Sequence, residues 1–161
     1  MTVFVCEEYI ESLEQLFSNY GLHVVVCRPK AEIPGSYWGP PEAGLISNSI
    51  YLRGDTPIHS ALHEASHFVC MTHARRCNLL TDAGGDDIEE SAVCFLQVLL
   101  ADYIPRFGRQ QCFADMDEWG YTFRFKSACY WFEHDAEDAL SWLTSYGLLD
   151  ELGNPSWCLR H

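Results

Sequence analysis

Basic residues are scarce in this sequence. Its 161 residues include 10 lysines and arginines against 23 aspartates and glutamates, which gives a formal charge of −13. The few basic residues form no stripe, so the composition argues against a nucleic-acid-binding protein. An acidic surface favours a basic partner or simply keeps the protein soluble.

Long apolar runs are absent as well. No run approaches the about 18 apolar residues that a membrane-spanning helix requires, so we expect no membrane partner. The first eight residues lack the basic segment that opens a signal peptide. We therefore expect a cytoplasmic protein.

The chain has eight cysteines but no C-x-x-C pair. Without paired spacing a cysteine zinc site is not expected, and in a reducing compartment the cysteines should be free thiols. There is also no P-loop, no G-x-G-x-x-G and no G-x-S-x-G, so the common nucleotide-binding and serine-hydrolase signatures are missing. With 48% hydrophobic residues, the chain is long enough for one domain, residues 1–161, around its own core.

The most informative segment is residues 63–67, His-Glu-Ala-Ser-His. Two histidines four residues apart on a helix lie on the same face, about one turn from each other. His63 and His67 can therefore bind one metal ion together, and Glu64 can act as an acid or base beside the open coordination position. The alternative interpretation is a pair of half-exposed helix histidines without a metal.

The surroundings of this segment predict a helix. Thr56 is a candidate N-cap with Pro57 at the first helical position, and residues 58–76 contain neither proline nor glycine. Apolar residues recur there at intervals of three and four, which indicates one buried face. His59 lies one turn before His63, but it is about 12 Å along the axis from His67, so the three histidines cannot share one ion.

A third metal ligand should come from the next predicted helix, which runs from Ile88 to Ile104. Glu89 shares the buried face of that helix, and a buried carboxylate needs a positively charged partner. We therefore expect Glu89 as the third ligand, with Glu90 as the second candidate. In the competing interpretation, Asp86 and Glu89 form a capping box and Glu89 satisfies only a backbone N–H.

The rest of the chain predicts further helices and a little sheet. Gly44–Ser47 and Ser49–Arg53 could be a short hairpin or a single bent strand across Asn48. A strand directly before the metal-binding helix could align an extended substrate. The aromatic residues of the last third are expected mainly to pack helices onto the core.

The predicted fold is an α+β, mostly helical, zincin-like domain with a small antiparallel sheet next to the HExxH helix. Helices are expected at 7–20, 115–133 with an interruption at Gly120, and 136–146, and a buried strand at 22–28.

A family resemblance appears around the same segment. Residues 60–68 read Ser-Ala-Leu-His-Glu-Ala-Ser-His-Phe, followed by Ala-Arg-Arg at 74–76 and Asp-Ile-Glu at 87–89. This order resembles the elongation factor P hydroxylase family, over roughly residues 49–105. The resemblance implies an iron-type metal held by His63, His67 and Glu89, and hydroxylation of a modified lysine on a translation factor. A second, looser similarity is to small zinc peptidases. Their HExxH motif is followed by a helix of the form Glu-x-x-Ala-x-x-Phe-x-x-x-Leu-Leu, and residues 89–100 resemble that helix.

Three functions follow from these observations. The first is a gluzincin-type zinc hydrolase of a protein or peptide substrate, with Glu64 as the base. The second is an iron-dependent hydroxylase, because two histidines and one carboxylate also suit Fe(II); the family resemblance favours it slightly. The third is a non-catalytic helical interaction domain. The expected cofactor is one divalent ion, Fe²⁺ or Zn²⁺, and Tyr121, Tyr130 and His134 are candidates for an oxyanion donor in the hydrolase.

Overall fold

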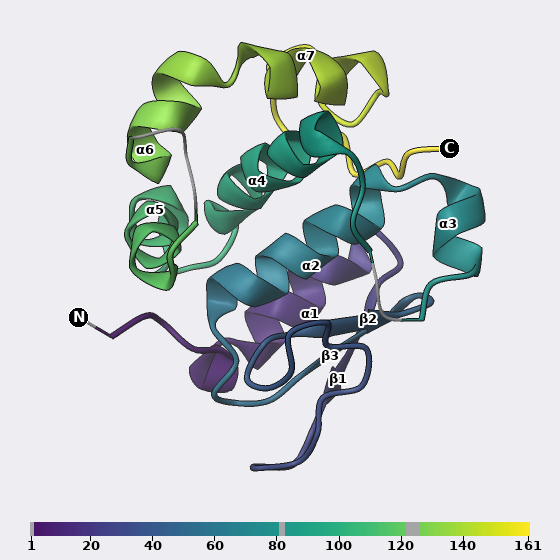
Figure 1. Cartoon of the computed structure of the whole chain (residues 1–161), viewed down its shortest axis with the longest axis vertical. Helices are drawn as coiled ribbons and strands as arrows, with labels where there is room; N and C mark the ends of the chain where they lie inside the picture. Colours follow the sequence, from purple (N-terminus) through teal and green to yellow (C-terminus); the bar gives the residue numbers. More distant parts are fainter. Residues whose placement is uncertain (1, 81–82, 122–125) are drawn as a thin grey trace.

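The helices and strands are stacked on one another along the long axis of the molecule (Figure 1). The computed structural model describes residues 2–80, 83–121 and 126–161. Helix α2 packs on strands β2 and β3, α4 packs across α2, and α7 packs on α4. The described elements are, in chain order, η1 (Cys6–Glu8), α1 (Ile10–Ser18), β1 (His23–Val26), β2 (Gly44–Ile46), β3 (Ser49–Leu52), α2 (Ile58–Cys70), α3 (His73–Cys77), α4 (Asp87–Ala101), α5 (Gly108–Trp119), α6 (Ala128–Tyr130), η2 (Trp131–Asp135) and α7 (Glu137–Ser145).

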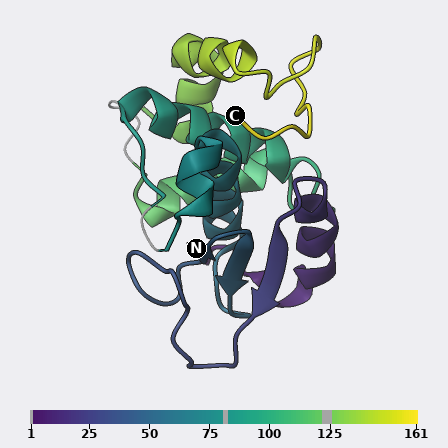
Figure 2. The same ribbon diagram turned by 90° about the vertical axis from the view of Figure 1, so that its right-hand side faces the viewer.

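The described strands form one mixed sheet in the order β1-β3-β2. Of the two alternatives for the segment around Asn48, the hairpin is confirmed and the single bent strand is not, because β2 and β3 pair antiparallel. The sheet is not purely antiparallel, however, since β1 pairs with β3 in parallel. The long connection from β1 to β2 allows this crossover. Figure 2 shows α1 beside this sheet, at the opposite end of the molecule from α7.

Two predictions about the strands were wrong. The first strand was expected to be buried, but β1 is an edge strand and Val26 is 50% exposed. The strand directly before α2 was expected to offer a free edge for an extended substrate. That strand is β3, which lies in the middle of the sheet and pairs on both sides, so neither of its edges can bind a peptide.

Helix α2 begins later and ends earlier than predicted. It starts at Ile58 after Pro57, and the Thr56 hydroxyl accepts a hydrogen bond from the Arg53 N–H at 2.9 Å, so Thr56 stabilises the preceding turn. At Met71 and Thr72 the backbone becomes extended, and the Thr72 side chain accepts from the Arg75 N–H to start α3. The predicted helix to Arg76 is thus two helices, and the turn between them points α3 in a new direction.

Helix α4 is the central helix of the structure. Its N-cap is Asp86, whose carboxylate accepts a hydrogen bond from the Glu89 N–H at 2.9 Å. Beyond the first turn it is buried on nearly all sides, because α2, α5 and α7 pack around it. A helix that is apolar all round belongs in a protein interior.

The buried apolar side chains of the described residues form one cluster that runs from α1 to α7. The described elements are mostly helices with one small sheet, which confirms the predicted α+β, mostly helical class. Among the described residues, no helix combines the length and apolarity needed to cross a bilayer.

Candidate metal centre

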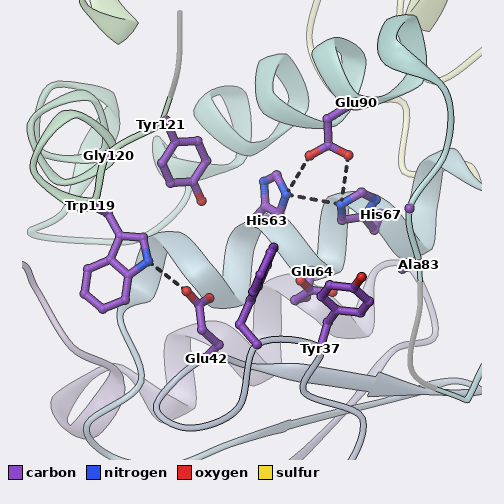
Figure 3. A pocket seen from close by; sticks show the side chains of 12 residues that line it. Tyr37, Glu42, His63, Glu64, His67, Ala83, Glu90, Trp119, Gly120 and Tyr121 are labelled. Carbon is purple, nitrogen blue, oxygen red and sulfur yellow. Dashed lines mark hydrogen bonds and ion pairs between the residues drawn. The ribbon is translucent and has the colours of Figure 1, made fainter.

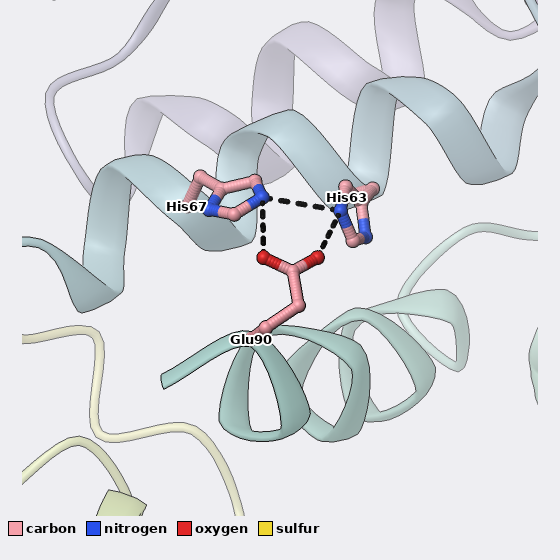
Figure 4. A group of neighbouring side chains, drawn as sticks. All are labelled: His63, His67 and Glu90. Atoms are coloured by element: carbon pink, nitrogen blue, oxygen red, sulfur yellow. Dashed lines mark hydrogen bonds and ion pairs between the residues drawn. The ribbon is translucent and has the colours of Figure 1, made fainter. Parts of the chain in front are cut away.

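His63 and His67 lie one turn apart on α2 and direct their Nε2 atoms at the same point (Figure 4). The two Nε2 atoms are 3.1 Å apart. His67 is buried and His63 is half-buried. The predicted convergence of the two imidazoles is present in the structure.

The third group at this point is Glu90, from the first turn of α4. Its carboxylate lies 3.0 Å from His63 Nε2 and 3.3 Å from His67 Nε2. Among the described residues, His63, His67 and Glu90 are the one group of histidine, cysteine and carboxylate atoms close enough to hold a metal ion. The two helices that meet here, α2 and α4, are among those that pack most closely in the fold.

The prediction that Glu89 is the third ligand is wrong. Its carboxylate is 4% exposed and faces Arg75 and Arg160, at 2.8 and 3.0 Å. Glu89 is therefore buried with charged partners, as the physical argument required, but those partners are arginines. The capping interpretation is half right, because Asp86 caps the Glu89 N–H, whereas among the described residues the Glu89 carboxylate accepts from the Arg75 and Arg160 side chains.

The backbone next to Glu89 is shaped around its carboxylate. A Cβ atom on Gly85 would lie 2.2 Å from Glu89 Oε2, so no larger residue fits at position 85 without moving this carboxylate. Arg160 also donates to the Cys70 carbonyl at 3.2 Å and stacks on Tyr146, which ties the C-terminal segment to the end of α2. These contacts fix the first turn of α4, and with it the direction of Glu90.

The spacing of the three groups fits a zinc ion. Zinc–nitrogen and zinc–oxygen bonds of about 2.0–2.2 Å at tetrahedral angles place ligand atoms about 3.3–3.6 Å apart. The two Nε2 atoms are 3.1 Å apart, and they lie 3.0 and 3.3 Å from the two different oxygens of Glu90. The groups therefore need to move apart by only a few tenths of an ångström to hold an ion between them. Two nitrogens and one oxygen are also a donor set that catalytic zinc sites use, and the same set suits non-haem iron.

Without a metal ion, the charges of these three groups are balanced by the protons that they bind. Burial lowers the pKa of His63, but the groups around the ring, Glu90 among them, outweigh burial and hold it well above the usual range. Burial raises the pKa of Glu90, but hydrogen bonds from His63 and His67 outweigh it and hold this pKa well below the usual range. The carboxylate thus stabilises positive charge at this point, which a divalent cation would also supply.

The three groups open into a pocket of about 630 Å³ (Figure 3). Glu64 lines the same pocket, one residue after His63, and is half-buried. Burial raises the pKa of the Glu64 carboxyl. A carboxylate with a raised pKa next to a metal site is suited to take up a proton at neutral pH.

Aromatic side chains form much of the pocket wall. Tyr37 and Trp38 come from the loop between β1 and β2, and Trp119 and Tyr121 come from the end of α5 and the residues after it. The Trp119 indole N–H donates to Glu42 at 2.7 Å across the pocket. The expectation that the aromatics of the last third mainly pack the core therefore holds only in part.

Tyr121 is the one of the three candidate oxyanion donors that lines this pocket. Its ring lies 5.6 Å from the His63 ring, and burial raises the pKa of its hydroxyl, which therefore stays protonated and able to donate. Tyr130 and His134 contact each other, with ring centroids 4.6 Å apart, and do not line the pocket.

Two further side chains surround the site: His59, which helix spacing excludes as a third histidine ligand, and Gln97, which was not anticipated from the sequence. His59 is buried, and burial lowers its pKa to about 3, so it is a neutral ring beside Tyr121 and outside the metal-binding group. Gln97 is fully buried and hydrogen-bonded to His63. Its position seven residues after Glu90, on the same face of α4, was the available signal.

Comparison with known proteins gave no relative. No protein-family model, no curated protein and no solved structure matches the chain.

The two neighbouring glutamates provide a direct test of the ligand assignment. We expect Glu90→Gln to weaken zinc binding by more than the about 10–100-fold that is typical when a metal ligand loses its supporting hydrogen bond. Glu89→Gln should lower zinc affinity only a few-fold, because the first turn of α4 is held less firmly, and should lower the free energy of unfolding by about 2 kcal/mol, because two arginines lose a charged partner. Titration with a zinc-binding dye and urea denaturation measure the two effects. The opposite pattern, with zinc lost in Glu89→Gln and kept in Glu90→Gln, would contradict the assignment.

Proposed function

We propose that this protein is a metal-dependent hydrolase that uses zinc held by His63, His67 and Glu90 to cleave a peptide or related amide bond. The observation that carries the proposal is the convergence of these three groups in a pocket that also contains Glu64. A structural zinc site would be closed by a fourth protein ligand. No described histidine, cysteine or carboxylate supplies one, and the Glu90 side chain is 44% exposed. An open site with a neighbouring base favours catalysis over a purely structural role.

The side chains of the pocket suit the steps of hydrolysis. A zinc ion bound to this donor set supplies Lewis acidity and lowers the pKa of water that reaches it. Glu64 takes a proton from the attacking water, for which its raised pKa is suited, and gives it to the leaving amine. Tyr121, protonated and beside His63, donates to the oxygen on which negative charge develops.

The shape of the pocket supports a protein or peptide substrate. The pocket is open at one side, and Trp38 at its wall is 80% exposed. Such exposed aromatic side chains provide large contact area for a chain lying across the opening. The free edge of a strand is not needed for this role, since the β1–β2 loop provides the contact surface.

The hydroxylase remains the second candidate, because two imidazoles and a carboxylate are also the iron ligands of many oxygenases. The family resemblance supports the hydroxylase less strongly once the contacts of the resembling residues are considered. Of the residues that carry the resemblance, Arg75 and Glu89 pair with each other, and Arg76 donates to the carbonyls of Phe68 and Met71. These are contacts that hold the fold together, and the carboxylate at the metal position is Glu90. A lysine-bearing translation factor as substrate belongs to this second candidate alone.

We place the protein in the cytoplasm. All eight cysteines are free thiols, and Cys77 and Cys158 are exposed. Exposed free thiols are typical of proteins in reducing compartments.

The role of Glu64 is the sharpest test of hydrolysis. We expect the zinc-loaded protein to cleave members of a random peptide library, detected by mass spectrometry, and Glu64→Gln to lower the rate by about 10²–10⁴-fold with zinc content unchanged. Because the variant loses the base and keeps its zinc, a lower rate reports on the chemical step and not on metal binding. Iron in the purified protein with oxygen consumption, and no peptide cleavage by the zinc form, would support the hydroxylase instead.

Trp38 should affect substrate binding more than chemistry. With the best peptide from the library, we expect Trp38→Ala to raise KM about five-fold, which corresponds to about 1 kcal/mol of lost aromatic contact, with little change in kcat. Leu152→Ala is the matched control, because Leu152 is 87% exposed and does not line the pocket. An unchanged KM in Trp38→Ala would show that the substrate does not contact this side of the pocket.

A further inference from the structure

Gln97 is a fully buried amide that connects the two helices of the metal centre. It lies on α4 two turns after Glu90, and it is 0% exposed. Its side-chain nitrogen donates to the backbone carbonyl of His59 at 2.8 Å. Its side-chain oxygen lies 2.9 Å from His63 Nδ1.

The orientation of this amide follows from its partners. A backbone carbonyl only accepts hydrogen bonds, so the end of the Gln97 side chain that faces His59 must be the NH₂ group. The end that faces His63 is then the oxygen, which also only accepts. His63 Nδ1 must therefore carry a hydrogen, and in the neutral ring the lone pair is on Nε2.

This tautomer matters because of where Nε2 points. His63 Nε2 faces His67 and Glu90, at 3.1 and 3.0 Å. In the protonated ring this atom donates to Glu90, and loss of that one proton leaves the lone pair there, free to bind a metal ion between the three groups. A neutral ring with its hydrogen on Nε2 would have to change tautomer before it could bind one.

We propose that Gln97 is a positioning residue that holds His63 in the Nδ1–H tautomer and so prepares its Nε2 lone pair for the metal ion. The proposal rests on the metal site proposed above. It distinguishes the two imidazoles, because the Nδ1 atom of His67 is buried and has no hydrogen-bond partner among residues 2–80, 83–121 and 126–161. Only His63 receives this support from the described residues, and it does so from a neutral amide instead of the carboxylate that many metal-binding histidines use.

The same amide also reaches the pocket wall. The Gln97 nitrogen has a second hydrogen, and it lies 3.3 Å from the Tyr121 hydroxyl oxygen. By donating to that oxygen, Gln97 helps to fix the position of the phenol beside His63. One buried side chain thus positions a metal ligand and the candidate oxyanion donor.

Two substitutions separate the roles of the two ends of the amide. Gln97→Met removes both hydrogen-bonding groups at similar volume, and we expect zinc affinity to fall by about 10–100-fold. Gln97→Glu restores an acceptor for His63 but loses the N–H donors to His59 and Tyr121. We expect it to recover zinc affinity to within a few-fold of the wild type while its melting temperature stays as low as that of Gln97→Met. Gln110→Met, at an exposed glutamine on α5, is the matched control and should change neither.

The tautomer itself can be read without activity. Long-range ¹H–¹⁵N correlation spectra of the wild type should show His63 protonated at Nδ1, both in the zinc-loaded protein and in the metal-free protein at alkaline pH, where the ring is neutral. This measurement stands even if Gln97→Met does not fold. A His63 ring protonated at Nε2, or zinc affinity in Gln97→Met equal to that of the wild type, would overturn the proposal. Failure of the proposed function gives a different result, in which the wild type binds no zinc while His63 still carries its hydrogen on Nδ1.

Discussion

The contact between α2 and α4 is the constraint on which the rest of the structure depends. One side of α2 carries two imidazoles, and the first turn of α4 brings a carboxylate within 3.3 Å of both. Further along the same contact, Gln97 joins the two helices through His63 and the His59 backbone. Burial of apolar side chains along α4 supplies the driving force for packing the two helices together, and the polar groups set how the helices align.

Two adjacent glutamates at the start of α4 have separate tasks, because successive side chains on a helix point about 100° apart. Glu89 points toward α3 and the C-terminal segment, where two arginines neutralise it. Glu90 points toward α2, where the imidazoles stabilise its negative charge. The arginine contacts hold the end of α4 in place, so the structural glutamate supports the direction of its neighbour. The C-terminal segment, through Arg160, therefore contributes to the geometry of the metal centre from the far end of the chain.

The sequence predicted the parts of the site that depend on local periodicity. The alignment of His63 and His67 follows from helical spacing, and the β2–β3 hairpin follows from the turn at Asn48. The choice of Glu89 failed because its burial is caused by Arg75 and Arg160, which are 14 and 71 residues away in the chain. No local pattern reports such partners. The mixed sheet and the pocket wall formed by the β1–β2 loop depend on chain crossings that spacing alone does not specify.

A crystal structure grown with zinc, with an anomalous difference map at the zinc absorption edge, would show whether α2 and α4 hold one metal ion between them. We predict one strong peak about 2.0–2.2 Å from His63 Nε2, His67 Nε2 and a Glu90 oxygen, with the Glu89 carboxylate still paired to its arginines. The absence of a peak between the two imidazoles, or a peak without a carboxylate ligand from α4, would contradict the account.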